Sequence, residues 1–345
     1  DGATSTSVCI LALRAMGYHN VDFLVPNRFD FGYGLSVPIV DEAAKQGAEV
    51  IVTVDNGISC IDGVTHAKSL GMQVVVTDHH LPGDVLPPAD AIVNPNQPGC
   101  EFPSKNLAGV GVAFYIMLAL KAELQQQGHF ERAGLAPPNL ASLLDIVAVG
   151  TVADVVVLDK NNRILVHQGL QRIRAGKCRP GIKALVEVAN RDCAHLTSTD
   201  LGFVVGPRLN AAGRLDDMSQ GIACLLEDET IQARMIAAEL DALNKERREI
   251  ETGMKAQAET VLEQMALDEG DMPSALVVYR EDFHQGVIGI VAGRLKEKYL
   301  KPVIAFAHQD DEIIKGSARS IPGVHIRDVL DEVNTRFPGV IEKFG

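Results

Sequence analysis

Carboxylate and imidazole side chains directly follow two apolar runs in the first third of the sequence. Asp55 follows residues 51–54, and the motif Asp78-His79-His80 follows residues 74–77. A third carboxylate, Asp154, lies in a nearly uncharged segment, where a buried charge costs several kcal/mol unless it is paired or binds a cation. Each residue alone fits a helix cap or a buried hydrogen bond. Together, these oxygen and nitrogen donors suit Mn²⁺ or Mg²⁺, and a pair of such ions can hydrolyse a phosphate ester.

Alternating strands and helices would bring these residues together. The pattern predicts strands at Val21–Pro26, Val50–Val54, Gln73–Thr77 and Ala91–Val93, with helices at Thr4–Met16, Val37–Gln46 and Ile58–Leu70 between them. Val- and Ile-rich strands that alternate with helices indicate a parallel sheet covered on both faces. Ligands of such sheets bind at the carboxyl ends of the strands, which is where the chemically active residues are expected.

The remainder of the sequence predicts a second, smaller α/β domain. The pattern predicts apolar helices at residues 107–126 and 140–150. It predicts one long helix at residues 229–268, where apolar residues are three, four or seven positions apart. After it we expect strands at Ala275–Tyr279, Val303–Ala307 and Glu312–Ser317 and helices at Val287–Lys298 and Ile326–Val333. The predicted class is therefore α/β. A parallel-sheet domain (1–227) is joined by a long helix (228–269) to a smaller α/β domain (270–345).

Composition narrows the class of protein. The chain of 345 residues carries a formal net charge of −13, with 46% hydrophobic and 22% charged residues, which is typical of a globular protein. We expect no membrane span and no signal peptide, and six cysteines without CxxC spacing indicate reduced thiols of a cytoplasmic protein. The acidic balance argues against broad attraction to nucleic acid but allows a local basic groove.

Several polar groups of the sequence could contact phosphate. Arg208, Asn210 and Arg214 are predicted in a Gly/Ala-rich turn, where a guanidinium can bind a phosphate with two hydrogen bonds; pairing with Asp216 or Asp217 is the alternative. Residues 160–183 hold seven basic residues and no acidic one, which fits a phosphate-tracking surface or a solvated face equally. The remaining candidates are Arg28 for a 5′-phosphate, Tyr33 for base stacking, and His284, Ser317, Arg319 and Ser320 for phosphate.

The motifs around these residues resemble the DHH phosphoesterase superfamily over essentially the whole chain. They include Asp1-Gly2, Val54-Asp55-Asn56-Gly57 and Asp78-His79-His80, then Leu107–Ala113, Gly150–Asp154, Gly206–Arg214, His284–Gly289 and Gly316–Ser320. The resemblance implies a metal-dependent 5′→3′ exonuclease that hydrolyses single-stranded DNA in repair and recombination. It also implies a two-metal Mn²⁺ or Mg²⁺ site, with single-strand-binding protein and a helicase as partners and no membrane.

The resemblance also implies a role for each residue of the cluster. Asp1, Asp55, His79 and Asp154 would bind metal, with Asp55 bridging two ions, and Asp78 and His80 would orient ligands or contact the phosphate. Asp1 would be the last carboxylate of an Asp-x-Asp-x-Asp-Gly motif. The family would also continue beyond Gly345, so we expect a core fragment with a weakened metal site.

Two other functions fit the same residues. One is a related phosphodiesterase that cleaves cyclic dinucleotides or very short oligonucleotides, which would not need the long helix or the basic surfaces. The other is a non-catalytic replication scaffold that binds single strands or proteins. The presence of Asp55, His79, His80 and Asp154 together argues against the scaffold.

Overall fold

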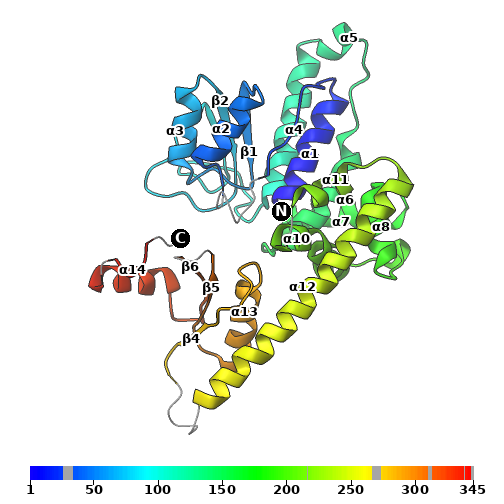
Figure 1. Ribbon diagram of the computed structural model, residues 1–345. Helices are drawn as coiled ribbons and strands as arrows, with labels where there is room; N and C mark the ends of the chain where they lie inside the picture. Colours follow the sequence, from blue (N-terminus) through cyan, green and yellow to red (C-terminus); the bar gives the residue numbers. More distant parts are fainter. Residues whose placement is uncertain (26–33, 216, 266–272, 310–312, 338, 343–345) are drawn as a thin grey trace. The chain divides into compact units, whose positions relative to one another are not determined.

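The structure, a computed structural model, describes residues 1–25, 34–215, 217–265, 273–309, 313–337 and 339–342, without the side chains of residues 214 and 260–265. The chain divides into two compact units, Asp1–Asn244 and Lys245–Gly345. The division falls inside the long helix α12 (Thr230–Met265), which belongs in part to each unit (Figure 1). The domain bounds 1–227, 228–269 and 270–345 stay a proposal.

The first unit contains a parallel three-stranded sheet. Its strands are β1 (Val50–Val54), β2 (Gln73–Thr77) and β3 (Ala91–Val93), in the order β1-β2-β3. Val50 pairs with Gln73 and Val75 with Ala91, so the carboxyl ends of all three strands lie at one edge. The helices α2 (Val37–Lys45) and α3 (Ile61–Ser69) pack on one another beside this sheet (Figure 1). The predicted parallel arrangement is confirmed.

One predicted strand is wrong. Residues 21–25 form no strand; residue 26 lies outside the described part of the chain. Val21 to Val25 contains Asp22, whose carboxylate Oδ1 accepts a hydrogen bond from the next backbone amide, that of Phe23. Such a local side-chain bond competes with strand pairing, which explains why a short apolar run does not join the sheet here.

Helices make up the remainder of the first unit and enclose its main core. They are α1 (Gly2–Ala15), α4 (Gly109–Gln126), α5 (His129–Ala133), η1 (Leu140–Leu143), α6 (Leu144–Ala153), α7 (Lys160–Arg174), α8 (Pro180–Val188), η2 (Cys193–His195), α9 (Ser198–Asp200), the π-helix η3 (Leu201–Val205), α10 (Gly206–Leu215) and α11 (Ser219–Leu226). The helix α6 is central, because Ile146, Val147, Ala148 and Val149 are fully buried in it. It packs on α1, α4 and α7 and therefore fixes where its C-terminal residue Asp154 lies.

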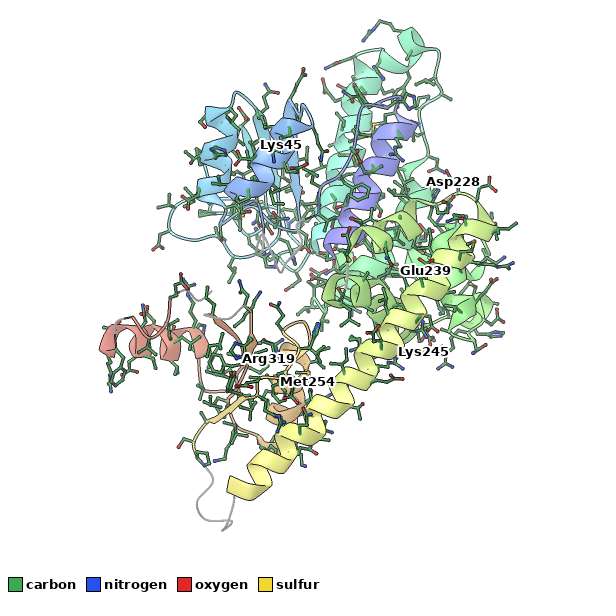
Figure 2. All side chains as sticks on the ribbon, in the orientation of Figure 1. Lys45, Asp228, Glu239, Lys245, Met254 and Arg319 are labelled. Atoms are coloured by element: carbon green, nitrogen blue, oxygen red, sulfur yellow. The ribbon has the colours of Figure 1, made fainter. Side chains whose placement is uncertain are left out.

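The second unit is a small α/β sandwich built on a mixed sheet. β4 (Leu276–Tyr279) pairs in parallel with β5 (Val303–His308), and β5 pairs antiparallel with β6 (Ile314–Arg319). The helix α13 (Ile288–Tyr299) covers one face, and its residues Val291 and Leu295 share a core with Met254 of α12 (Figure 2). A last helix, α14 (Ile326–Arg336), follows β6.

The long helix contributes to both cores. Ala233, Ala237 and Leu240 are fully buried in the first unit, and Met254 and Ala258 are buried in the second. At about 1.5 Å per residue, its 36 residues span roughly 54 Å. The predicted helix at 229–268 therefore exists, with nearly the predicted bounds. No helix among the described residues is long and apolar enough to cross a membrane.

Candidate metal centre

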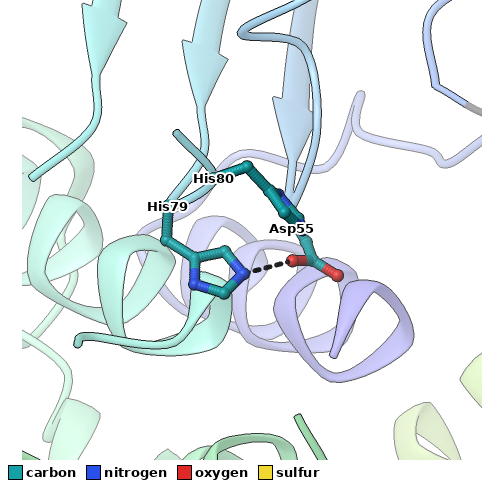
Figure 3. Close-up of side chains that lie close together, drawn as sticks. All are labelled: Asp55, His79 and His80. Atoms are coloured by element: carbon teal, nitrogen blue, oxygen red, sulfur yellow. Dashed lines mark ion pairs between the residues drawn. The ribbon is translucent and has the colours of Figure 1, made fainter. Parts of the chain in front are cut away.

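Four side chains from four segments of the first unit converge on one point. The donor atoms of Asp1, Asp55, His79 and Asp154 all lie within 4.8 Å of one another. His79 Nε2 is 3.1 Å from Asp55 Oδ1, 3.4 Å from Asp154 Oδ2 and 3.9 Å from Asp1 Oδ2. Figure 3 shows the His79–Asp55 pair beneath the ends of the strands. All four residues were predicted as metal ligands from the sequence.

The turn after β1 positions Asp55 by a strained backbone. Asp55 has a φ of 59°, in the left-handed region, and Gly57 has a φ of 113°. A side chain at Gly57 would place its Cβ 2.4 Å from Thr53 Oγ1, which itself donates a 2.7 Å hydrogen bond to the carbonyl oxygen of Asn56. Only glycine fits this turn, and the turn directs the Asp55 carboxylate away from the end of the strand.

Asp1 lies at the amino end of a helix, and Asp154 lies at the carboxyl end of another. Asp1 precedes α1 and accepts a 3.0 Å hydrogen bond at Oδ1 from the backbone amide of Val110, at the start of α4. Asp154 ends α6, where the carbonyl groups of the last turn disfavour a negative charge. Neither Asp1 Oδ2 nor Asp154 Oδ2, both buried, has a hydrogen-bond partner among the described residues.

The helix α4 can approach these carboxylates because it begins with glycine. A Cβ at Gly109 would lie 2.8 Å from Asp1 Oδ2 and 2.9 Å from both Cβ and Oδ1 of Asp55. The amino end of α4 therefore meets the carboxylates without a side chain between them. Its exposed amides and dipole favour negative charge at this point, although they neutralise it only in part.

The charge of the cluster fits a divalent cation. Burial raises the pKa of Asp154, the His79 imidazole partly offsets this, and the Asp55 carboxylate raises it further. Three carboxylates that converge with few hydrogen bonds repel one another, and a cation removes that repulsion. The donor set of oxygens and one imidazole nitrogen is the set that Mn²⁺ accepts. The residues present therefore fit such an ion.

Asp78 does not point into the cluster but organises the loop that carries it. Its side chain is 1% exposed, and it accepts hydrogen bonds from the amides of Ile58, His79 and His80 and from His80 Nδ1 at 2.7 Å. Burial alone would raise the pKa of Asp78, but the bonds from His80 and these amides together lower it. The hydrogen bond between His80 Nδ1 and the Asp78 carboxylate is also the main reason why the pKa of His80 is raised.

His80 gives a second set of donors that overlaps the first. Its ring is half-exposed, and with Asp55 and His79 it forms another group of donor atoms within 4.8 Å. The two sets share Asp55 and His79. This overlap is compatible with the prediction that Asp55 bridges two ions.

Two asparagines that the sequence analysis missed hold this loop in place. Asn94 and Asn96 follow β3, and their side-chain amides donate to the carbonyl oxygens of His80 and His79 at 2.9 and 2.6 Å. Asn94 is 1% exposed. Polar residues directly after β1 and β2 were considered as site residues because ligands bind at the carboxyl ends of parallel strands. The same argument applied to β3 would have found both asparagines.

The predicted phosphate contacts of the first unit differ from one another in burial and in hydrogen bonding. The segment 206–215 is the helix α10 and not a turn, since Pro207 supplies a suitable start for a helix. Arg208 is buried, with Nε and Nη2 each 2.8 Å from Asp241 Oδ1 and Nη1 donating to the Val204 carbonyl oxygen. Its partner is thus neither Asp216 nor Asp217. Asn210 is exposed on α10. Arg28, Tyr33 and the side chain of Arg214 lie outside the described residues.

The basic run 160–183 is partly structural. Arg174 donates to the Leu196 carbonyl oxygen, and Arg179 binds the carbonyl oxygens of residues 225–227 and the Asp228 carboxylate at 2.6 Å. Lys160, Arg163, Lys177 and Lys183 are exposed. These four are the exposed cations of the run.

The predicted residues of the second unit gather near the start of α13. Ser317 and Arg319 lie on β6, which runs two residues beyond the predicted strand Glu312–Ser317. A Cβ at Gly289 would meet Arg319 Nη2 at 2.9 Å and Ser317 Oγ at 3.0 Å. His284 Nδ1 accepts a hydrogen bond from the Gly286 amide just before this helix. Ser320 donates to the Val324 carbonyl oxygen and so closes a turn. Cations, hydroxyls and a helix start together suit an anion.

Comparison with known proteins gives consistent relatives along the chain. The model of the DHH family, N-terminal domain, matches residues 1–151, and that of the DHHA1 domain matches residues 273–345. The single-stranded-DNA-specific exonuclease RecJ of Escherichia coli is 61% identical over 345 residues, which is all of this chain and 60% of that protein. The Bacillus subtilis protein of the same name is 38% identical over 98% of this chain and 40% of its own length. The chain thus spans about 60% or less of these relatives.

Solved structures agree with the sequence comparison. A crystal structure of exonuclease RecJ bound to manganese matches with a TM-score of 0.77 and 33% identity, over 95% of this chain and 77% of that one. RecJ of Thermus thermophilus in complex with Mn²⁺ matches with a TM-score of 0.75 and 31% identity, over 96% of this chain and 45% of that one.

Proposed function

We propose, from the premise that this chain belongs to the RecJ family of DHH phosphoesterases, that it forms the core of a metal-dependent 5′→3′ exonuclease acting on single-stranded DNA. The observation that carries the proposal is the convergence of Asp1, Asp55, His79 and Asp154 within 4.8 Å. The cytoplasmic location, a role in repair and recombination, and single-strand-binding protein and a helicase as partners stay predictions from the sequence.

The cluster would hold Mn²⁺ or Mg²⁺. Asp1, Asp55, His79 and Asp154 would supply the ligands, and His80 would lie beside them. When bound, such ions activate a water molecule and neutralise charge at the phosphoryl centre. Gly109 keeps the amino end of α4 against the carboxylates, so that they hold their positions before a substrate arrives.

His80 would bind the phosphate that is cleaved. Its Nδ1 is fixed to Asp78, which leaves Nε2 to contact a substrate oxygen. The raised pKa of His80 favours the imidazolium, and an imidazolium attracts a phosphate oxygen and can donate a proton to it. Asp78 acts as a positioning residue, since its hydrogen bonds set the orientation of the ring.

The test compares Asp55→Ala with Asp84→Ala on 5′-labelled single strands in Mn²⁺. Asp84 is an exposed carboxylate and serves as the matched control. We expect Asp55→Ala to lose at least tenfold in rate and to keep its fold by circular dichroism, whereas Asp84→Ala matches the parent. Cleavage by Asp55→Ala at more than a tenth of the parent rate would reject the metal assignment.

The same assay separates the other two functions. A cyclic dinucleotide, supplied beside the long strand, would be degraded preferentially by a small-substrate phosphodiesterase. A scaffold would bind the strand and release no nucleotide in any divalent metal. We expect mononucleotides to appear from the 5′ end of the single strand and little product from the dinucleotide.

A further inference from the structure

Large apolar side chains are exposed on three segments at the metal centre. Leu81, which follows His80, is 81% exposed, and Val155, which follows Asp154, is 86% exposed. Phe203, in the π-helix η3, is 73% exposed. A single exposed apolar residue is ordinary, but two that directly follow residues of the charged cluster, with a third on a segment that packs against the end of α6, suit a ligand with an apolar face.

Packing places Phe203 beside the end of α6. A Cβ at Gly202 would lie 3.3 Å from Val152 Cγ1, and one at Gly206 would lie 3.2 Å from the Cβ of Ala153. The backbone on both sides of Phe203 therefore contacts the two residues that precede Asp154. A π-helix often marks a functional site, because it is a costly interruption of a helix.

Phe203 is also the most exposed phenylalanine or tyrosine among the described residues of the first unit; the next is Tyr18, at 39%. Tyr18 lies beyond the far end of α1, whose start follows Asp1 and whose 14 residues span roughly 21 Å at about 1.5 Å of rise per residue. Aromatic residues are only 5% of the chain and tryptophan is absent. An aromatic ring left in solvent on a segment that packs against the end of α6 is therefore a specific feature of this unit.

We propose that Phe203, flanked by Val155 and Leu81, stacks on the nucleobase next to the phosphate bound at the metal centre. The proposal rests on the proposed function, since it assigns a subsite to the same substrate. An unpaired base presents its whole face to a ring, whereas a base inside a duplex is covered by its neighbours. Phe203 would thus contribute to the preference for single strands.

A tryptophan probe tests binding without any cleavage. Phe203→Trp would be the sole tryptophan of the chain, so its fluorescence reports this position alone. We expect oligothymidylate, added without divalent metal, to quench it, and the same strand made of abasic residues to leave it unchanged. Tyr18→Trp is the matched control and should respond to neither. Equal signals of Phe203→Trp with both strands would overturn the proposal.

Kinetics give the second readout. The parent should cleave a strand with normal bases with a lower KM, by about tenfold, than one whose first nucleotides are abasic. Phe203→Ala should lose this difference, and Phe203→Tyr should retain it. The exposed ring makes no core contact, so both variants should fold. If Phe203→Ala keeps the full preference for bases, the stacking role is wrong while the exonuclease function stands. An inactive parent that still shows quenching would refute the function and support the subsite.

Discussion

Asp78 accepts a 2.7 Å hydrogen bond from His80 Nδ1 although its own side chain is only 1% exposed. A buried carboxylate beneath a half-exposed imidazole fixes the tautomer of the ring and keeps it protonated at a higher pH than usual. The three residues of the Asp78-His79-His80 motif therefore differ in function. Asp78 organises the loop, His79 meets the carboxylates, and His80 faces solvent.

Replacing Asp78 should change stability in a pH-dependent way in the metal-free protein. The raised pKa of His80 stabilises the fold below the unfolded histidine pKa of about 6.5, and this stabilisation is lost as pH rises through the folded pKa. The lowered pKa of Asp78 stabilises the fold above about pH 3.9, and this is lost as pH falls through its folded value.

Asp78→Asn should therefore lose the most stability between these two limits and lower the pKa of His80. Urea unfolding across pH and a proton NMR titration of the histidines measure the two effects. Asp84→Asn, at an exposed carboxylate, is the control. A His80 pKa that stays at the parent value in Asp78→Asn would contradict the positioning role.

Gly109→Ala should weaken metal binding with little loss of fold. The added methyl would lie 2.8 Å from Asp1 Oδ2 and 2.9 Å from Asp55 Cβ, so the carboxylates or the start of α4 must shift. We expect Mn²⁺ affinity, measured by calorimetry, to fall by tenfold or more. Gly253→Ala is the matched control, because its Cβ meets nothing within 4 Å in α12 and should stabilise the helix by about 0.5–1 kcal/mol. Equal Mn²⁺ affinity of the two variants would show that Gly109 is not needed at the site.

The convergence of the candidate metal ligands could be predicted from the sequence for a physical reason. Parallel strands end at one edge, so Asp55 and His79, each directly after a strand, must lie close together. Asp154 was found because an acidic residue is out of place in an apolar segment. Asp1 came only from the family resemblance, since nothing local shows that the start of α1 reaches the sheet.

Other features depend on long-range packing that no local pattern reveals. Arg208 was predicted to contact a phosphate, with pairing to Asp216 or Asp217 as the alternative, but it pairs with Asp241, 33 residues later, on α12. The predicted strand Glu312–Ser317 ends two residues too early, because pairing of Val303 of β5 with Arg319 extends β6 to Arg319. The exposure of Phe203 could not be predicted from the sequence, because the residue lies in a π-helix and a π-helix has no sequence signature.

Arg208→Ala should destabilise the first unit by about 3–5 kcal/mol. It would leave the 4% exposed carboxylate of Asp241 without its guanidinium. Differential scanning calorimetry measures the loss, and Asp241→Ala should show a similar one. Arg163→Ala, at an exposed arginine, is the control and should not change stability. If Arg208→Ala keeps the parent stability and instead reduces the salt dependence of single-strand binding by about one phosphate, Arg208 is a substrate contact.

Val155→Asn should raise stability by relieving strain beside the metal centre. Val155 has a φ of 63°, and a β-branched residue in the left-handed region is a genuine outlier. Asparagine tolerates this conformation, and at 86% exposure the loss of apolar contact is small. We expect a gain of about 1 kcal/mol, or roughly 2–4 °C in Tm. Val155→Thr keeps the β-branch and therefore the strain, so it should melt with the parent. If both variants melt at the parent temperature, the backbone at Val155 carries no strain. Its left-handed conformation then has no energetic cost.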